Sequence, residues 1–418
     1  MKITAIGIGT RGDVEPLADL GKEIISRGHE FRVASFEKFK PLIESKGVKY
    51  IHLDGDANRL MKLLVTNYKT SMDFMTGCVK LFKENPQYMK QLEEAIQGSD
   101  FVLYGMLGGF AYHICELYHI PCARIFYSPF DKTDLYSLYT EEHNSPKVAK
   151  TYNMEETGMN LLTILLVNKW RKQHGLKRWS IFSDYRKKDG ENILTFYPVS
   201  PVFMPQDPHW GNHIHVTGYW YHPQESDDFI PDAELEKFLE TGEKTIFIGF
   251  GKAVSPELAR LQHIVLEAVK ELDIRTVMQA DQITEDERES CNNQIYFVGD
   301  ISYHWIFERV RAVVHHGGCS TNGLGLYSGC PTLVIPLALD QLFYGRTIHE
   351  LGCGPAPLYI RKELCTKDEV KAAITELTDG RYEKKAKEVS EQLKREFGAK
   401  KAADIIEGSF LQSAALQI

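Results

Sequence analysis

The stretch RAVVHHGGCSTNGLG, residues 311–325, changes abruptly from an apolar run to histidines, glycines and small hydroxylated residues. The β-branched run Ala312–Val314 predicts a short strand buried in a parallel sheet. Ser320, Thr321 and Asn322 favour the start of a helix, so we expect a strand, a tight turn and a helix N-terminus. Such an end presents unpaired backbone N–H groups, and its usual ligand is a phosphate. The alternative is a strand-to-helix junction that uses glycine only for close packing.

The same alternation of strands and helices extends to both sides of this stretch. Helical spacing is present in Leu17, Leu20 and Ile24, which follow Pro16 as a first-turn residue, and in Pro256–Leu272. Apolar runs predict strands at Ile3–Ile8, Phe31–Phe36, Val48–Leu53, Phe101–Tyr104, Cys122–Tyr127, Ile193–Tyr197, Ile214–Tyr219, Thr245–Ile248, Arg275–Met278, Ile295–Val298, Ala312–His315 and Thr332–Ile335. The fold class is therefore α/β, with parallel sheets covered on both faces.

The 418-residue chain is too long for one ordinary core, so we expect two doubly wound, Rossmann-like domains. A segment rich in proline, aromatic and acidic residues separates them. We predict an N-terminal domain at 1–222, a linker at 223–240, a second domain at 241–400, and a C-terminal tail or helix at 401–418 that packs back towards the first domain. Ligands of such sheets bind at the carboxyl ends of the strands, so we expect the domains to face each other across a cleft.

The composition excludes several classes of protein. With 43% hydrophobic and 25% charged residues the chain is globular, and its net charge of −8 argues against a nucleic-acid binder. The eight cysteines form no CxxC pair and are expected to be reduced thiols. The N-terminus leads directly into a strand, and the longest apolar run, Leu161–Val167, is too short to cross a bilayer, so we expect a cytoplasmic protein.

Two motifs carry a family resemblance. GTRGDVEP, residues 9–16, follows the first strand, and HHGGCSTNGLGLYSGCPTLVIPLALDQLFYGR, residues 315–346, includes the opening stretch. Together they resemble the glycosyltransferases of the GT-B fold, and within these the sterol glucosyltransferases and the bacterial enzymes that glycosylate antibiotic aglycones. VNKWRKQHGLKRW and VTGYWY extend the resemblance over nearly the whole chain.

The resemblance implies an inverting, metal-independent transfer of a hexose from a UDP- or dTDP-sugar to a hydroxyl group, with no cofactor besides this co-substrate. Asp13 is then the candidate base, since it matches the family aspartate of the GTRGD turn. An unperturbed carboxylate is a weak base at neutral pH and would act mainly by orientation. The alternative is an aspartate that only caps the turn before the Pro16 helix.

The donor site implied by the resemblance comes mainly from the second domain. Backbone N–H groups of the 318–321 turn and His316 would surround the diphosphate, and Asp340 with Gln341 would bind sugar hydroxyls. Ser320 and Lys252 depart from the family pattern, while Trp305 could stack near the base or pack in the core. The predicted donor residues are Thr10, Arg11, Lys252, Trp305, His316, Gly318, Cys319, Ser320, Thr321, Asp340 and Gln341.

The acceptor site implied by the resemblance lies in the first domain, where the 104–139 region is aromatic. We predict that Phe110, Tyr127 and Phe130 contact a hydrophobic acceptor such as a sterol, polyketide, flavonoid or lipid, and that about half of the region's aromatics are packing residues. Met159–Trp170 is apolar and basic residues follow it, which suits an acceptor-lining helix or a weak peripheral contact with lipid headgroups.

Other patterns suggest different functions but are weaker. Asp54-Gly55-Asp56 is a DxD, a metal motif of another glycosyltransferase fold, yet it lies in the wrong domain. His315 and His316 are neighbours on a strand and point to opposite faces, so we expect no metal site there and a packed His315. Gly7 to Gly12 fits GxGxxG of a dinucleotide-binding oxidoreductase only loosely. A nucleotide-sugar 2-epimerase and a silent nucleotide-sugar-binding protein remain alternatives.

Overall fold

The computed structural model describes residues 1–66, 71–137, 145–186, 190–221, 229–240, 245–251, 256–291, 293–337, 339–359 and 365–415. The chain forms two compact units. The first consists of Met1–His222 together with Phe397–Ile418, and the second of Pro223–Glu396. The chain therefore completes the second unit before its last helix joins the first.

The first unit contains a seven-stranded parallel sheet in the order β3-β2-β1-β4-β5-β6-β7. Its strands are β1 (Lys2–Ile6), β2 (Glu30–Phe36), β3 (Lys49–Leu53), β4 (Phe101–Gly105), β5 (Cys122–Ile125), β6 (Leu194–Tyr197) and β7 (Ile214–Val216). The strand order reverses direction between β1 and β4. In doubly wound sheets, the carboxyl ends of the strands at such a switch point form the ligand site.

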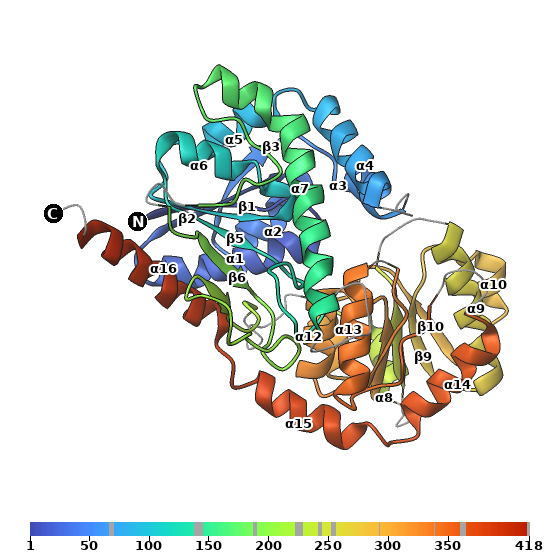
Figure 1. Ribbon diagram of the computed structural model, residues 1–418. Coiled ribbons are helices and arrows are strands. Elements are labelled where there is room, and N and C mark those ends of the chain that lie inside the picture. The colour runs from blue at the N-terminus through green and yellow to red at the C-terminus, as the bar shows by residue number, and fades with distance from the viewer. Residues whose placement is uncertain are drawn as a thin grey trace. The chain divides into compact units, whose positions relative to one another are not determined.

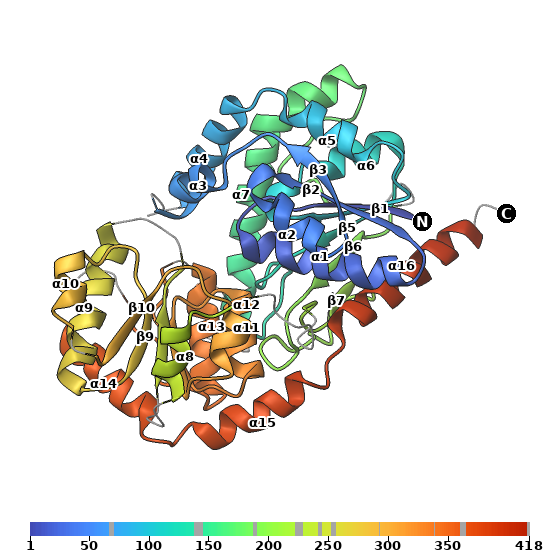
Figure 2. The same cartoon turned by 180° about the vertical axis from the view of Figure 1, so that it is seen from behind.

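Helices cover both faces of this sheet. Figures 1 and 2 show α1, α2 and α16 on one face and α5 and α6 on the other. The helices of this unit are α1 (Arg11–Ser26), α2 (Lys40–Ser45), α3 (Ala57–Met61), α4 (Ser71–Glu84), α5 (Tyr88–Ile96), α6 (Ala111–Tyr118), α7 (Pro146–Gln173) and α16 (Gly398–Ala415). Because both faces are covered, the inner strands are buried along nearly their whole length: every residue of Phe31–Phe36 in β2 is buried, including Arg32 and Ser35.

The second unit contains a five-stranded parallel sheet in the order β10-β9-β8-β11-β12. Its strands are β8 (Ile246–Gly249), β9 (Thr276–Gln279), β10 (Ile295–Val298), β11 (Ala312–His315) and β12 (Thr332–Val334). The switch point of this sheet lies between β8 and β11. A ligand site is expected at the carboxyl ends of these two strands.

Alternate residues of the second sheet enter two separate cores. Ile246, Ile248 and Val314 pack with residues of α9 and α14, whereas Phe247 and Val313 face α8 and α11. The helices of this unit are α8 (Ala233–Glu240), α9 (Pro256–Leu272), α10 (Glu285–Glu289), α11 (Tyr303–Phe307), α12 (Cys319–Tyr327), α13 (Leu339–Glu350), α14 (Lys367–Thr378) and α15 (Glu383–Leu393). The sheet is thus apolar on both faces, as its β-branched runs predict.

Each predicted strand is present, with ends that differ by up to three residues, and α9 spans Pro256–Leu272 as predicted. The placement of Pro16 in the first turn of its helix was wrong. The helix begins at Arg11 with Thr10 as its N-cap, so Pro16 lies in the second turn. Thr10 and Asp13 start the helix before the proline is reached, and Pro16 merely leaves the carbonyl of Gly12 without its helical donor.

The 28-residue helix α7 is held to α6 by a buried ion pair. Arg171 of α7 bonds to both carboxyl oxygens of Glu116 in α6, at 2.5 and 3.1 Å, and lies 2.8 Å from Nδ1 of His113. Across the ranges that the structure describes, no helix is both long and apolar enough to cross a bilayer.

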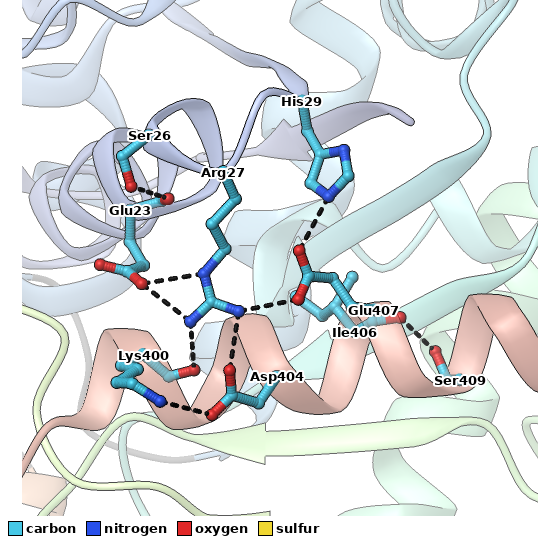
Figure 3. A network of polar contacts seen from close by, with 9 residues as sticks. All are labelled: Glu23, Ser26, Arg27, His29, Lys400, Asp404, Ile406, Glu407 and Ser409. Carbon is cyan, nitrogen blue, oxygen red and sulfur yellow. Dashed lines mark hydrogen bonds and ion pairs between the residues drawn. The ribbon is translucent and has the colours of Figure 1, made fainter.

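The C-terminal helix α16 packs beside α1 in the first unit (Figure 2). Figure 3 shows how Arg27, the residue after α1, lies between Glu23 of its own helix and α16. Its Nη1 donates to Asp404 at 2.7 Å and to Glu407 at 2.8 Å, and His29 lies 2.9 Å from Glu407. The network joins residues almost 400 positions apart, so the last helix is part of the first unit's structure.

Candidate functional site

The turn after β1 holds Asp13 at the carboxyl edge of the first sheet. Asp13 is the third residue of α1, and its Oδ2 accepts hydrogen bonds from the backbone N–H of Thr10 at 2.6 Å and from the Thr10 hydroxyl at 2.9 Å. No described residue donates a hydrogen bond to Oδ1. Asp13 therefore caps the helix, which was the alternative to a catalytic role, but this capping uses only one of its oxygens.

Burial changes the acidity of this carboxyl group. One edge of Asp13 is still exposed, but protein surrounds most of the carboxyl, and this burial raises the pKa of Asp13 above its usual value even though two hydrogen bonds from Thr10 lower it. A higher pKa makes a carboxylate a stronger base at neutral pH. Burial thus makes Asp13 a stronger base than the sequence alone suggests.

The carboxyl group of Asp13 occupies the space that a side chain at Gly9 would fill. The φ of Gly9 is +150°, and a Cβ atom at this position would lie 2.2 Å from Oδ2 of Asp13. Any other residue would be strained and would displace the carboxyl. The first glycine of the GTRGD turn is therefore required by the close return of the aspartate.

An apolar pocket opens at the carboxyl ends of the first five strands. Ile8, Phe36, Asp54, Gly105 and Phe126 line it from these strand ends, and side chains of α4 and α7 complete its wall. Its volume is about 130 Å³. This is close to the roughly 150 Å³ of engineered cavities that bind benzene, so the enclosed part accommodates about one ring.

Two of the three predicted acceptor residues line this pocket. Phe110 and Phe130 line the pocket, and Phe130 stacks on Phe126 at 4.1 Å between ring centroids. Tyr127 is not part of the lining, and its hydroxyl donates to the backbone carbonyl of Asp13 at 3.4 Å. Tyr139 of the aromatic region lies outside the described residues. Among the remaining aromatics, Tyr104 and Phe126 line the pocket, whereas Tyr112 and Tyr136 are buried in the core.

A second candidate site lies at the carboxyl ends of β8 and β11. The ring of His316 lies between two glycines, because a Cβ added to Gly251 would be 3.6 Å from its Cε1 and one added to Gly318 would be 2.8 Å from its Nε2. Gly318 is the N-cap of α12, and no side chain caps this helix. Ser320 and Thr321 are the second and third residues of the helix, where backbone N–H groups have no helical acceptor. The arrangement suits an anion.

The two adjacent histidines differ in their partners. His315 is fully buried, and its Nδ1 accepts a hydrogen bond from the backbone N–H of Gly317 at 2.9 Å. Burial lowers the pKa of His316 to about 4, so this imidazole is neutral at pH 7. Its Nδ1 is inaccessible to solvent and has no partner within the described ranges. Nε2 of His315 likewise has no partner within the described ranges. His315 is thus a packed residue, whereas the ring of His316 lies beside the start of α12 through its Nε2.

Two family models match the chain, one in each half. Residues 3–129 match the glycosyltransferase family 28 N-terminal domain, and residues 263–407 match the C-terminal domain of erythromycin biosynthesis protein CIII-like proteins. The chain is also 30% identical to the sterol 3-beta-glucosyltransferases of Pichia angusta, over 100% of its length, and of Candida albicans, over 97%. It spans 34% and 27% of the lengths of those relatives.

Solved structures show the same arrangement of strands and helices. The glycotransferase of kitacinnamycin has a TM-score of 0.71 at 18% identity and covers 97% of this chain and 98% of its own. The calicheamicin glycosyltransferase CalG4 has a TM-score of 0.69 at 16% identity over 99% and 98%. The spinosyn rhamnosyltransferase SpnG complexed with thymidine diphosphate has 0.64 at 14% over 97% and 100%. The chain has the GT-B fold.

In this GT-B fold the predicted sugar-binding residues lie beside the turn after β11. Asp340 and Gln341 are in the first turn of α13, and the amide oxygen of Gln341 accepts a hydrogen bond from the backbone N–H of Leu337 at 2.7 Å. The φ of Gly317 is +91°, and a Cβ there would approach the carbonyl of Gln341 to 3.0 Å. The turn after β11 and the start of α13 therefore pack against each other.

Three other predicted donor residues have different surroundings. Trp305 in α11 is partly buried, with Phe229 at 5.5 Å and the Arg309 guanidinium at 4.4 Å from its ring. Arg11 is largely exposed and forms a two-point ion pair with Glu15. Lys252 lies outside the described residues. Trp305 thus has the packing that the sequence offered as an alternative, and Arg11 already has a partner on its own helix.

The departure at position 320 fits the turn. Ser320 lies inside α12 and is not among the described residues with positive φ, so serine replaces the usual glycine without strain. Cys319 accepts a hydrogen bond from the Tyr344 hydroxyl at 3.0 Å. The chain therefore keeps a helix start directly after the turn that follows β11.

Sequence reasoning missed Arg124 and the polar role of Tyr104. Both line the pocket of the first unit and lie side by side in register on β4 and β5. Only the pairing of the strands brings these two residues together. An arginine inside an apolar strand was the one available signal.

The DxD pattern has structural uses. Asp56 caps α3 by accepting a hydrogen bond from the backbone N–H of Asn58 at 2.8 Å, and Asp54 pairs with His52 at 2.9 Å. The part of the chain that the structure describes contains no cluster of three or more potential metal ligands.

Proposed function

We propose that this chain is a glycosyltransferase that transfers a hexose, with inversion and without a metal ion, from a UDP- or dTDP-sugar to a hydroxyl group of a hydrophobic small molecule. The observation that carries the proposal is the apolar pocket at the carboxyl edge of the first sheet, the edge where Asp13 keeps one free carboxyl oxygen and a raised pKa. The names of the relatives, which act on sterols, support an apolar acceptor.

Asp13 acts as the base in this mechanism. Thr10 holds Oδ2, so Oδ1 is the atom that takes the proton from the acceptor hydroxyl. The acceptor oxygen then forms a bond to the anomeric carbon as the bond from that carbon to the diphosphate breaks, and the electron pair leaves with the nucleotide diphosphate. The raised pKa of Asp13 favours its taking up the proton as this bond forms.

The second unit binds the leaving group in this proposal. The free N–H groups at the start of α12 face negative charge as it develops on the diphosphate, and fixed donors of this kind need no reorganisation during the reaction. Neutral His316 adds an N–H donor, and the approach of a diphosphate raises its low pKa. The thymidine diphosphate bound by SpnG supports a nucleotide diphosphate as ligand.

The experiment is incubation with UDP-glucose or dTDP-glucose and a panel of sterol and phenolic acceptors, with and without EDTA. We expect a product heavier by one hexose, with the anomeric configuration opposite to that of the donor in its NMR spectrum. Turnover is expected to be equal in EDTA. Isomerised donor without a glycoside would indicate the epimerase, nucleotide binding without any product would indicate the silent binder, and loss of turnover in EDTA would refute the metal-free mechanism.

We infer, as a second property, a weak peripheral contact between α7 and lipid. Met154 and Leu165 of α7 are 78% and 67% exposed, and Phe182 after the helix is 89% exposed. Lys169 and Lys172 are exposed near the end of the same helix, which suits an anionic lipid surface. Flotation with vesicles containing phosphatidylserine is the test, and a protein that stays entirely in the soluble fraction would contradict the contact.

A further inference from the structure

The hydroxyl group of Tyr104 is an unusual feature of the pocket in the first unit. Tyr104 lies in β4, is 2% exposed and lines the pocket, yet its hydroxyl has no hydrogen-bond partner in the described part of the chain. Buried hydroxyl groups are almost always hydrogen-bonded, because leaving one unpaired costs free energy. A polar atom left unpaired in the wall of a ligand pocket points to a ligand that pairs with it.

Arg124 stands next to Tyr104 in the same wall. Tyr104, Arg124 and Thr195 are paired in register across β4, β5 and β6, so their side chains project from the same face of the sheet. The Thr195 hydroxyl accepts from Nε and Nη2 of Arg124, at 3.1 and 2.9 Å, and Asp131 accepts from Nη2 at 2.8 Å. No described residue accepts from Nη1. Arg124 also lines the pocket, with its side chain 12% exposed.

Other polar side chains of the lining already have protein partners. Asp54 accepts a hydrogen bond from the Gln91 amide, and Asp56 caps α3. The hydroxyl of Tyr88 donates to the backbone carbonyl of Leu107 at 3.2 Å. Tyr88 and Tyr104 are thus two buried tyrosines of one pocket, one with its hydroxyl bonded to the protein and one without.

We propose that Tyr104 and Arg124 form an oxygen-binding subsite in the acceptor pocket. The acceptor is then an apolar ring compound that carries, besides the hydroxyl group that receives the sugar, a second oxygen on the ring inserted into the pocket. A carbonyl or carboxylate oxygen accepts from both the tyrosine hydroxyl and Nη1, and a hydroxyl group pairs equally well with them. The inference rests on the proposed function and specifies its acceptor.

The size of the pocket supports this assignment. A pocket volume of about 130 Å³ takes about one ring, so the reacting hydroxyl belongs to the part of the acceptor outside the pocket. A sterol whose single oxygen is the reacting hydroxyl would place only hydrocarbon against Tyr104 and Arg124. Such a molecule would leave both donors unpaired, and the site discriminates against it for that reason.

The experiment compares matched acceptors in matched variants. Dehydroepiandrosterone is paired with the same steroid lacking the ketone, and a naphthol with an acetyl group on its far ring is paired with the unsubstituted naphthol. In each pair the second oxygen cannot itself receive a sugar. The wild-type protein, Tyr104→Phe and the control Tyr88→Phe are assayed for kcat/KM with every acceptor at saturating donor.

We expect the wild-type protein to prefer the ketone-bearing member of each pair by about tenfold or more. Tyr104→Phe is expected to reduce this ratio to near one, whereas Tyr88→Phe retains it. A general loss of active protein cancels in the ratio, so a purely structural role of Tyr104 would not change it. Equal ratios in all three proteins would overturn the subsite and leave the proposed function standing. A wild-type protein that binds no UDP and glycosylates none of the compounds would refute the proposed function itself.

Thermal unfolding without ligand provides an independent readout. Tyr104→Phe removes an unpaired buried hydroxyl, so its Tm is expected to equal or exceed that of the wild type. Tyr88→Phe leaves the Leu107 carbonyl without its donor, so its Tm is expected to fall. A decrease in Tyr104→Phe as large as that in Tyr88→Phe would mean that the Tyr104 hydroxyl has a protein partner, and it would overturn the inference.

Discussion

In the first unit the carboxyl ends of the central strands surround an apolar pocket and a carboxyl group, whereas in the second unit they carry glycines, a neutral histidine and an uncapped helix. Both sheets have the same parallel, doubly wound order around β1 or β8. The difference lies in the loops after the strands. One architecture thus provides two kinds of site, because strand ends position whatever side chains or backbone groups follow them.

The helix that follows β1 and the helix that follows β11 also differ in how their N-termini are capped. The start of α1 is capped by Asp13, so its N–H groups are partly satisfied within the protein. Among the described residues no side chain caps the start of α12, where Ser320 and Thr321 have backbone N–H groups without a helical acceptor. A capped helix start suits a positioned carboxylate, and an uncapped one suits a bound anion. The following variants test this distinction.

Asp13→Asn is expected to have the largest effect. The amide keeps the hydrogen bond to the Thr10 backbone but cannot accept the proton, so kcat should fall by about a hundredfold to ten-thousandfold. The affinity for UDP, measured by calorimetry, should be unchanged because the proposed nucleotide site lies in the other unit. Glu23→Gln, which changes an acid on the same helix far along from the turn, is the control. Normal turnover in a folded Asp13→Asn protein would leave capping as the only role of Asp13.

The pH dependence of kcat/KM also tests whether Asp13 is the base. The base must be ionised, so kcat/KM should rise with pH through the pKa of Asp13. Because burial raises that pKa, the midpoint of the acid limb should lie above the usual value of about 3.9. Rate profiles from about pH 3 to about pH 8 provide the measurement. A midpoint at or below the usual value would contradict the effect of burial.

His316→Ala tests the second unit alone. Loss of one hydrogen bond to a charged diphosphate should weaken UDP binding by about tenfold to a hundredfold. The kcat/KM ratio between matched acceptors should not change, since the acceptor pocket lies in the first unit. His263→Ala, which removes an exposed histidine of α9, is the control. Equal UDP affinity in His316→Ala and His263→Ala would remove His316 from the nucleotide site.

Arg27→Ala is expected to have the smallest effect. The network of Figure 3 holds α16 against α1, but its carboxylates are partly exposed and therefore screened. We expect the free energy of unfolding to fall by about 1 kcal/mol and the amide hydrogens of α16 to exchange faster. UDP affinity should remain as in the wild type. Unchanged exchange in α16 would mean that its apolar face alone holds the helix in place.

Local sequence patterns predicted much of the fold. Runs such as Ala312–His315 predicted strands, and the spacing in Pro256–Leu272 predicted a helix, because the periodicity of buried residues is a local property. The same reasoning placed the start of α1 too close to Pro16. A proline is easier to recognise in a sequence than the capping by Thr10 and Asp13 that starts this helix at Arg11. The role of His316 was implied by the resemblance, whereas the packed His315 was predicted from the alternation of side chains along a strand.

The sequence by itself determined the individual strands and helices and the glycine-rich turns after β1 and β11, because these depend on residues that are close together in the chain. Only the tertiary structure decided the rest of the candidate sites. The pocket combines strand ends from Ile8 to Phe126, and Tyr104 and Arg124 meet only because β4 and β5 pair in one register. The raised pKa of Asp13 and the lowered pKa of His316 arise from burial, which depends on the atoms that surround a group after folding.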